Sequence, residues 1–153
     1  MNNCYVFMRT IAITGGRDRL PTKDQRRAMA QLDISIPTHL VNGGARGIDT
    51  AVAERAKKAG WIVTTIYYQS FLKDKGGHTR NAILVRSGDF LITFGGNKGT
   101  ANCVEQAIKW GCPVVDWSGL VGREGENWKL HLPAARKRKR WSGKPRKRRA
   151  ESD

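Results

Sequence analysis

The segment TIAITGG, residues 10–16, decides the fold prediction: it is a short run rich in β-branched residues that ends on two glycines. Apolar runs of the same kind recur along the chain, and helical patterns lie between them. Each run is short enough to be one strand of a sheet. The expected strands are residues 10–14, 39–41, 61–68, 90–94 and 113–115.

The segments between these strands place apolar residues at helical spacing. Residues 48–59 show this most clearly, and Gly60 follows them where a glycine commonly ends a helix. Near-continuous apolar strands that alternate with helices are typical of a parallel sheet covered on both faces. We therefore predict an α/β fold with a doubly wound, mainly parallel five-stranded sheet. The expected helices are residues 24–32, 48–59, 79–87 and 100–110.

Positive charge is concentrated at the C-terminal end. The chain has 28 Lys and Arg residues against 13 Asp and Glu, a formal net charge of +15, and residues 134–153 hold ten of the bases and two of the acids. Such a segment cannot bury enough apolar surface to offset its ordering entropy. We expect one domain over residues 1–133 and a disordered basic tail over residues 134–153. Within the domain, residues 117–133 are expected to form a closing loop and a short helix.

Two interpretations of the tail are open. It is either a solvated segment that aids solubility or a segment that binds nucleic acid through phosphates, because Lys and Arg release condensed counterions when they bind phosphate. A tryptophan among the bases can stack on a nucleobase. The residues that would make these contacts are Arg136, Lys137, Arg138, Lys139, Arg140, Trp141, Lys144, Arg146, Lys147, Arg148 and Arg149.

Composition argues against several classes of protein. No apolar run approaches the roughly 18 residues that a membrane span needs, and the N-terminus lacks the pattern of a secretory signal. The three cysteines are too few and too scattered for a disulfide framework or a zinc site, and the three histidines show no metal-ligand spacing. We expect a reduced, cytoplasmic protein with no membrane partner, no metal and no cofactor.

Glycine pairs follow three of the expected strands, at Gly15-Gly16, Gly43-Gly44 and Gly95-Gly96. The carboxyl ends of parallel strands share one edge of the sheet, where open α/β folds bind ligands. Two of the pairs lead into expected helices, whose first N–H groups and positive dipole end attract phosphate. We expect the three loops to hold a phosphate group; turns that only need glycine are the alternative. The dinucleotide fingerprint and the Walker pattern are both absent, which argues against a standard nicotinamide dehydrogenase.

Four motifs in order resemble the SLOG superfamily: ITGGRD from Ile13, GGARGID from Gly43, the pair Arg80-Asn81, and GGNKGT from Gly95. The spacing is most similar to its short, single-domain YspA-like branch of bacteria and phages, and more distantly to the Lonely-guy phosphoribohydrolases and DNA-processing protein A. The resemblance covers about residues 9–115. It implies a Rossmann-like fold that binds a nucleotide or a derivative of the ADP-ribose or NAD type. The ligand residues it implies are Gly15, Gly16, Arg17, Gly43, Gly44, Arg46, Asp49, Arg80, Asn81, Gly95, Gly96, Gly99 and Thr100.

These residue types suit a nucleotide. Glycine amides and arginines can bind phosphate, and Asp49 or Asn81 can bind a ribose hydroxyl. The arginines could instead brace the fold or be solvated. Asp49 could equally brace its own loop by accepting backbone N–H bonds near a helix start.

Catalysis is a separate question. The Lonely-guy enzymes have the pattern GG-x-GT-x-x-E, whose glutamate assists cleavage of the base–ribose bond. The third residue after Thr100 is Cys103, which we expect to be a small helix-packing residue, and Glu105 lies roughly 200° around the helix from it. Asp18, Asp49 or Glu105 could replace the glutamate only if the loops bring them to the ligand.

Three functions are therefore weighed. The first is binding of a nucleotide-derived small molecule without turnover, and the second is a DNA- or RNA-binding protein related to DNA-processing protein A. The third is a nucleoside-monophosphate phosphoribohydrolase, for which Arg80 and Glu105 are the catalytic candidates. The expected partners are the small molecule, nucleic acid at the tail and, in a homo-oligomer, further copies of the chain.

Overall fold

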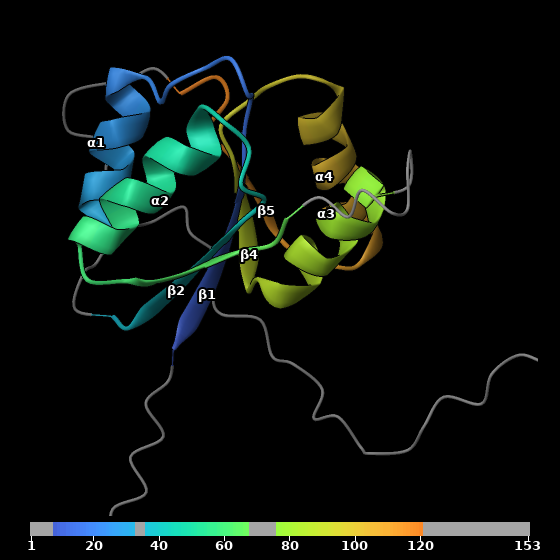
Figure 1. Cartoon of the computed structure of the whole chain (residues 1–153), viewed down its shortest axis with the longest axis horizontal. Helices are drawn as coiled ribbons and strands as arrows, with labels where there is room; N and C mark the ends of the chain where they lie inside the picture. The colour runs from blue at the N-terminus through green and yellow to red at the C-terminus, as the bar shows by residue number, and fades with distance from the viewer. Residues whose placement is uncertain (1–7, 33–35, 68–75, 121–153) are drawn as a thin grey trace, which may run out of the picture.

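We describe a computed structural model of the chain over residues 8–32, 36–67 and 76–120. In this part of the chain, five strands form one parallel sheet in the order β3-β2-β1-β4-β5, accompanied by four helices. Figure 1 shows α1 and α2 to one side of the sheet and α3 and α4 to the other. The elements are β1 (Arg9–Thr14), α1 (Lys23–Gln31), β2 (Thr38–Asn42), α2 (Ile48–Lys58), β3 (Ile62–Thr65), α3 (Gly76–Ser87), β4 (Phe90–Thr93), α4 (Lys98–Lys109) and β5 (Val114–Asp116).

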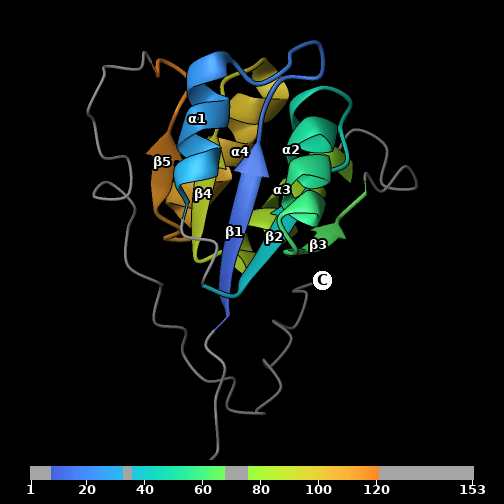
Figure 2. The ribbon, with the colours of Figure 1, turned by 90° about the vertical axis from the view of Figure 1, so that its left-hand side faces the viewer.

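The sheet is covered on both faces. Helices α1 and α2 lie on one face, and α3 and α4 lie on the other (Figure 2). Because successive strand side chains point to opposite faces, Ile11 and Ile13 of β1 pack in the core under α1 and α2, whereas Ala12 packs under α3 and α4. The predicted Rossmann-like, doubly wound parallel sheet is confirmed.

The ends of some elements differ from the predictions. Strand β3 stops at Thr65 rather than at residue 68, and α3 begins at Gly76 rather than at residue 79. Helix α4 begins at Lys98, because the Asn97 side chain caps it by accepting a hydrogen bond from the Gly99 amide at 3.2 Å. Gly60 follows α2 with φ of +81°, as expected for a glycine that ends a helix.

Not every apolar residue of the helices is buried. Ile83 and Ile108 lie in the apolar patterns of two expected helices but are 39% and 71% exposed, while Val85 and Cys103 are fully buried. Ala59 is also exposed rather than buried. The rotation of each helix is set by its cap and by packing, which a run of adjacent apolar residues does not specify.

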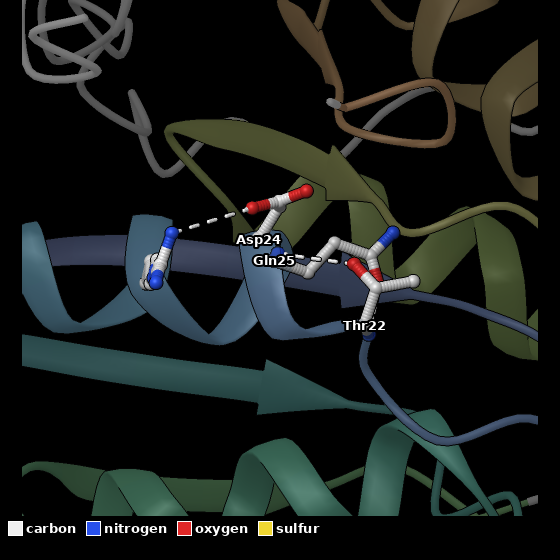
Figure 3. Close-up of polar contacts among 4 residues, drawn as sticks. Thr22, Asp24 and Gln25 are labelled. Carbon is white, nitrogen blue, oxygen red and sulfur yellow. Dashed lines mark hydrogen bonds and ion pairs between the residues drawn. The ribbon is translucent and has the colours of Figure 1, made fainter. Parts of the chain in front are cut away.

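Helix α1 is fixed at its start by a capping box (Figure 3). The Thr22 hydroxyl accepts a hydrogen bond from the Gln25 amide at 3.1 Å, and the Gln25 side-chain oxygen accepts one from the Thr22 amide at 2.9 Å. The buried Gln25 side-chain nitrogen donates to the carbonyls of Phe94 and Trp117, both at 3.0 Å. The start of α1 is thereby tied to the segments that follow β4 and β5.

The order of the strands creates a switch point. From β1 the chain proceeds outward to β2 and β3, then returns past β1 to form β4 and β5. Thr14 pairs with Thr93 at the carboxyl ends of β1 and β4, and the loops after them touch, because the Gly16 amide donates to the Gly95 carbonyl at 2.9 Å. Open α/β sheets bind ligands at this place. Among the described residues, no helix has the length and apolar character required to cross a bilayer.

Candidate functional site

A cavity of about 410 Å³ opens at the switch point, beside the carboxyl end of β1. Its walls come from the end of β1, the β2–α2 loop, α2, α3 and the first turn of α4. The volume lies within the usual range for small-molecule sites. The lining residues are Thr14, Gly15, Arg17, Ala45, Asp49, Arg80, Asn97, Lys98, Gly99 and Thr100.

Asp49 is the most unusual residue of the cavity. It is the second residue of α2 and only 4% exposed. Its Oδ2 atom accepts hydrogen bonds from the amides of Gly43 at 3.1 Å and Ala45 at 3.3 Å, which confirms the loop-bracing interpretation. Its Oδ1 atom is buried and has no hydrogen-bond partner among the described residues. One oxygen therefore holds the loop, and the other is an unused acceptor in a residue that lines the cavity.

Burial raises the pKa of Asp49 from 3.8 to about 6, because desolvation disfavours the carboxylate. The two loop amides and the charges of Arg80 and Arg17 act in the opposite direction and limit the rise. Asp49 is therefore mostly ionised at neutral pH. A buried carboxylate oxygen without a partner is costly, and a ligand hydroxyl that donated to it would remove that cost.

Arg80 and Asn81 of α3 together join α3 to the β2–α2 loop and to α4. The Arg80 Nη1 atom donates to the Gly43 carbonyl at 2.7 Å, and its Nε atom donates to the Asn81 side-chain oxygen at 2.9 Å. The Asn81 side-chain nitrogen in turn donates to the Gly99 carbonyl at 3.2 Å and to Asn102 Oδ1 at 3.0 Å. Asn81 thus positions both Arg80 and the first turn of α4 without lining the cavity itself.

The first turn of α4 contributes the positive end of a helix. Lys98, Gly99 and Thr100 line the cavity, and first-turn amides have no acceptor within their own helix. Asn97 accepts from the Gly99 amide, and the amides of Lys98 and Thr100 belong to the same first turn, whose N–H groups have no acceptor within the helix. Together with the Lys98 ammonium, this turn is suited to an anion.

Several of the expected glycines serve loop packing. The amides of Gly43 and Gly44 bond to Asp49 and Asn42, so they are already occupied. A Cβ atom at Gly96 would lie 2.4 Å from Thr100 Oγ1 and 2.8 Å from the backbone nitrogen of a facing glycine. The expected residues that do not line the cavity are Gly16, Gly43, Gly44, Arg46, Asn81, Gly95 and Gly96.

Of the two catalytic candidates, Arg80 lines the cavity and Glu105 does not. Glu105 is exposed and does not line the cavity. Cys103 is fully buried, and burial raises the pKa of its thiol to about 12, which confirms a packing role. Among the described residues, no group of three His, Cys, Asp or Glu side chains could hold a metal ion. The basic tail, residues 134–153, lies outside the described residues.

Four cavity residues were not predicted from the sequence: Thr14, Ala45, Asn97 and Lys98. Asn97 carried a usable signal, because Asn directly before a helical pattern is a common N-cap. Ala45 carried no signal in the sequence, since its place in the cavity wall follows from the hydrogen bonds between its loop and Asp49.

The family of the chain follows from its sequence. Residues 8–131 match the model of the SLOG cluster4 family. The chain belongs to this family. This confirms the predicted membership of the SLOG superfamily, and the matched region contains every residue that lines the cavity.

Two relatives are similar in sequence. An uncharacterized protein of Archaeoglobus fulgidus is 34% identical over 96 residues, which are 56% of this chain and 64% of the archaeal protein. The gene 61 protein of Mycobacterium phage D29 is 34% identical over 125 residues, 72% of this chain and 97% of the phage protein.

Two solved structures share the fold. The TM1055 protein superposes with a TM-score of 0.54 and 21% identity, covering 70% of this chain and 72% of its own. DNA processing protein A (DprA) from Streptococcus pneumoniae superposes with a TM-score of 0.59 and 16% identity, covering 81% of this chain and 54% of its own.

Proposed function

We propose that this SLOG protein binds a nucleotide or a nucleotide-derived molecule in the cavity at the switch point. The phosphate lies at the first turn of α4 and near Arg17 and Arg80, and a ribose hydroxyl donates to Asp49 Oδ1. The observation that carries the proposal is the unpartnered, buried Oδ1 atom of Asp49, a residue of the cavity that the first turn of α4 also lines.

The cavity combines a hydrogen-bond acceptor, Asp49 Oδ1, with the positive groups of Arg17, Arg80 and the α4 start, and this combination favours a ligand that has both a hydroxyl and an anion. An inorganic anion would use the helix start and the arginines. It would leave Asp49 Oδ1 without a hydrogen-bond donor, and its negative charge would repel the Asp49 carboxylate. A neutral sugar would use Asp49 and leave the positive groups without a partner. A sugar phosphate satisfies both, because it carries a hydroxyl donor and an anion in one molecule. Membership of the SLOG family supports a nucleotide-related role in general.

Calorimetry tests this proposal. We expect adenosine 5′-monophosphate, ADP-ribose or ribose 5-phosphate to bind, and adenosine and inorganic phosphate to bind at least tenfold more weakly. Arg17→Gln should weaken the binding, whereas the control Glu105→Gln, at an exposed position outside the cavity, should not. No binding by any of the phosphorylated sugars would refute the proposal.

Hydrolysis of a nucleotide is the second candidate. Among the described residues that line the cavity, Asp49 is the one carboxylate, and its pKa of about 6 suits a group that exchanges a proton near neutral pH. Chromatography after incubation with adenosine 5′-monophosphate measures released adenine. Release that disappears in Asp49→Asn would support this activity, and no release from any common nucleotide would exclude it.

Binding of nucleic acid by the basic tail is a separate proposal, supported by its net charge of +8. A full-length variant with glutamine at positions 136–140 removes five bases. If all five contact duplex phosphates, the slope of log affinity against log salt should fall in magnitude by about 4 to 5. An unchanged slope would show that these residues do not bind the duplex.

A further inference from the structure

A second hollow adjoins the cavity. It measures about 240 Å³ and shares three residues with the first, namely Arg17, Ala45 and Arg80. The two hollows are therefore separated by one wall, whose charged members are arginines. The residues found only in the second hollow are Gly43, Gly44, Arg46 and Tyr67.

Tyr67 gives this hollow an aromatic surface. The residue follows β3 and is 71% exposed, which is unusual for a large aromatic side chain. Its ring lies close against the backbone of Gly44, where φ is +70° and a Cβ atom would come within 3.2 Å of two ring carbons. The chain before it is fixed, because the Asn42 side chain donates to Thr65 Oγ1 at 3.2 Å. The ring thus lies beside the Gly44 backbone with most of its surface uncovered.

The charge of this hollow is positive. Three of its seven lining residues are arginines, and none is acidic. Arg17 and Arg46 are exposed, and the side chains of both make no hydrogen bond or ion pair with the residues the structure describes. An exposed aromatic ring beside two exposed arginines is a combination that can bind a base by stacking and its phosphate by charge.

We infer that this hollow is a second nucleotide subsite, in which a base stacks on Tyr67 and a phosphate binds Arg46. Since the hollows share the Arg17–Arg80 wall, a ligand that fills both carries two nucleosides joined through phosphate at that wall. The inference rests on the proposed function, because it assumes that the Asp49 cavity holds the first nucleotide. The link is a phosphodiester or a pyrophosphate, and both would meet the same arginines.

Calorimetry with matched ligands and variants tests the inference. The ligands are adenosine 5′-monophosphate, the 5′-phosphorylated diadenylate pApA, and the pyrophosphate-linked diadenosine diphosphate. We expect one or both dinucleotides to bind wild type about 5- to 150-fold more tightly than the mononucleotide, the range for one stacked base. Tyr67→Ala should abolish this gain, Tyr67→Phe should keep it, and both should leave mononucleotide affinity and the urea midpoint unchanged. The dinucleotide that shows the gain in affinity identifies the link between the two nucleosides as a phosphodiester or a pyrophosphate.

Three results would overturn the inference. If the mononucleotide binds but neither dinucleotide binds more tightly, the second subsite does not exist while the proposed function stands. If Tyr67→Ala weakens mononucleotide and dinucleotide equally, Tyr67 belongs to the first site. If wild type binds none of the three ligands, the proposed function fails and the inference fails with it.

Discussion

The substitution Asp49→Asn should increase stability at neutral pH. The amide oxygen can accept the two loop hydrogen bonds now made by Oδ2, and the amide nitrogen replaces the unpartnered Oδ1. The variant therefore keeps the loop and removes a buried charge. Because protonated Asp49 and asparagine are both neutral, wild type and variant should be close in stability at acid pH.

The magnitude follows from the pKa. The folded value of about 6 lies above the ordinary 3.8, so the folded protein binds this proton more tightly than the unfolded chain does. The contribution of Asp49 to stability is thus complete below pH 4 and is lost as the pH rises through 6. A shift from 3.8 to about 6 corresponds to about 3 kcal/mol. The variant should therefore gain about 3 kcal/mol relative to wild type between pH 4 and pH 7.

Urea unfolding followed by tryptophan fluorescence at pH 4, 5, 6 and 7 measures this difference. The control is the exposed Glu105→Gln, which should change the free energy of unfolding by no more than about 0.5 kcal/mol. If the curves of wild type and Asp49→Asn run parallel between pH 4 and pH 7, Asp49 is not a desolvated carboxylate and the reasoning is refuted.

Four substitutions test the site and its support. Arg17→Gln should weaken nucleotide binding about 10- to 150-fold in calorimetry, as for one hydrogen bond to a charged group, with an unchanged urea midpoint because the residue is exposed. Gly96→Ala should destabilise the fold by about 1–3 kcal/mol in urea, since its Cβ would meet the backbone of Gly16, whereas Gly99→Ala has room and should be neutral or stabilising by up to about 1 kcal/mol. Gln25→Leu leaves two buried carbonyls without their donor, and we expect a loss of about 2–4 kcal/mol in the same assay; a loss below 0.5 kcal/mol would contradict this account.

The fold was predictable because local signals agree along most of the chain. Buried parallel strands need continuous apolar runs, and glycine marks their ends, so five strands and four helices were placed correctly in order. The ends of elements were harder, because single side chains decide them. Asn97 moves the start of α4 two residues before Thr100, and Ile108 is exposed because α4 buries the face of Thr100, Cys103 and Ala107.

The sequence predicted where the candidate site lies in the fold, but it did not predict which residues contact one another there. Strand ends predicted that the three glycine loops meet at one edge. The Gly16 amide bonds to the Gly95 carbonyl, and the Gly16 carbonyl accepts from the amide of Ile48 at the end of the Gly43-Gly44 loop, so the three loops do meet. Sequence could not tell which glycines face the cavity, because this depends on packing between distant segments. The bond between Arg80 and Gly43, 37 residues apart, is one such contact. For Asp49, ligand binding and loop bracing were weighed as alternatives; Oδ2 braces the loop, and Oδ1 has no hydrogen-bond partner among the described residues.

The most direct test of the central claim is a cycle of four affinities. Adenosine 5′-monophosphate and its 2′,3′-dideoxy analogue are titrated into wild type and into Asp49→Asn by calorimetry. If a ribose hydroxyl donates to Asp49 Oδ1, wild type should prefer the ribonucleotide by about 10- to 150-fold, and the variant should lose most of that preference. Equal preference in the two proteins would contradict the claim that Asp49 recognises the sugar.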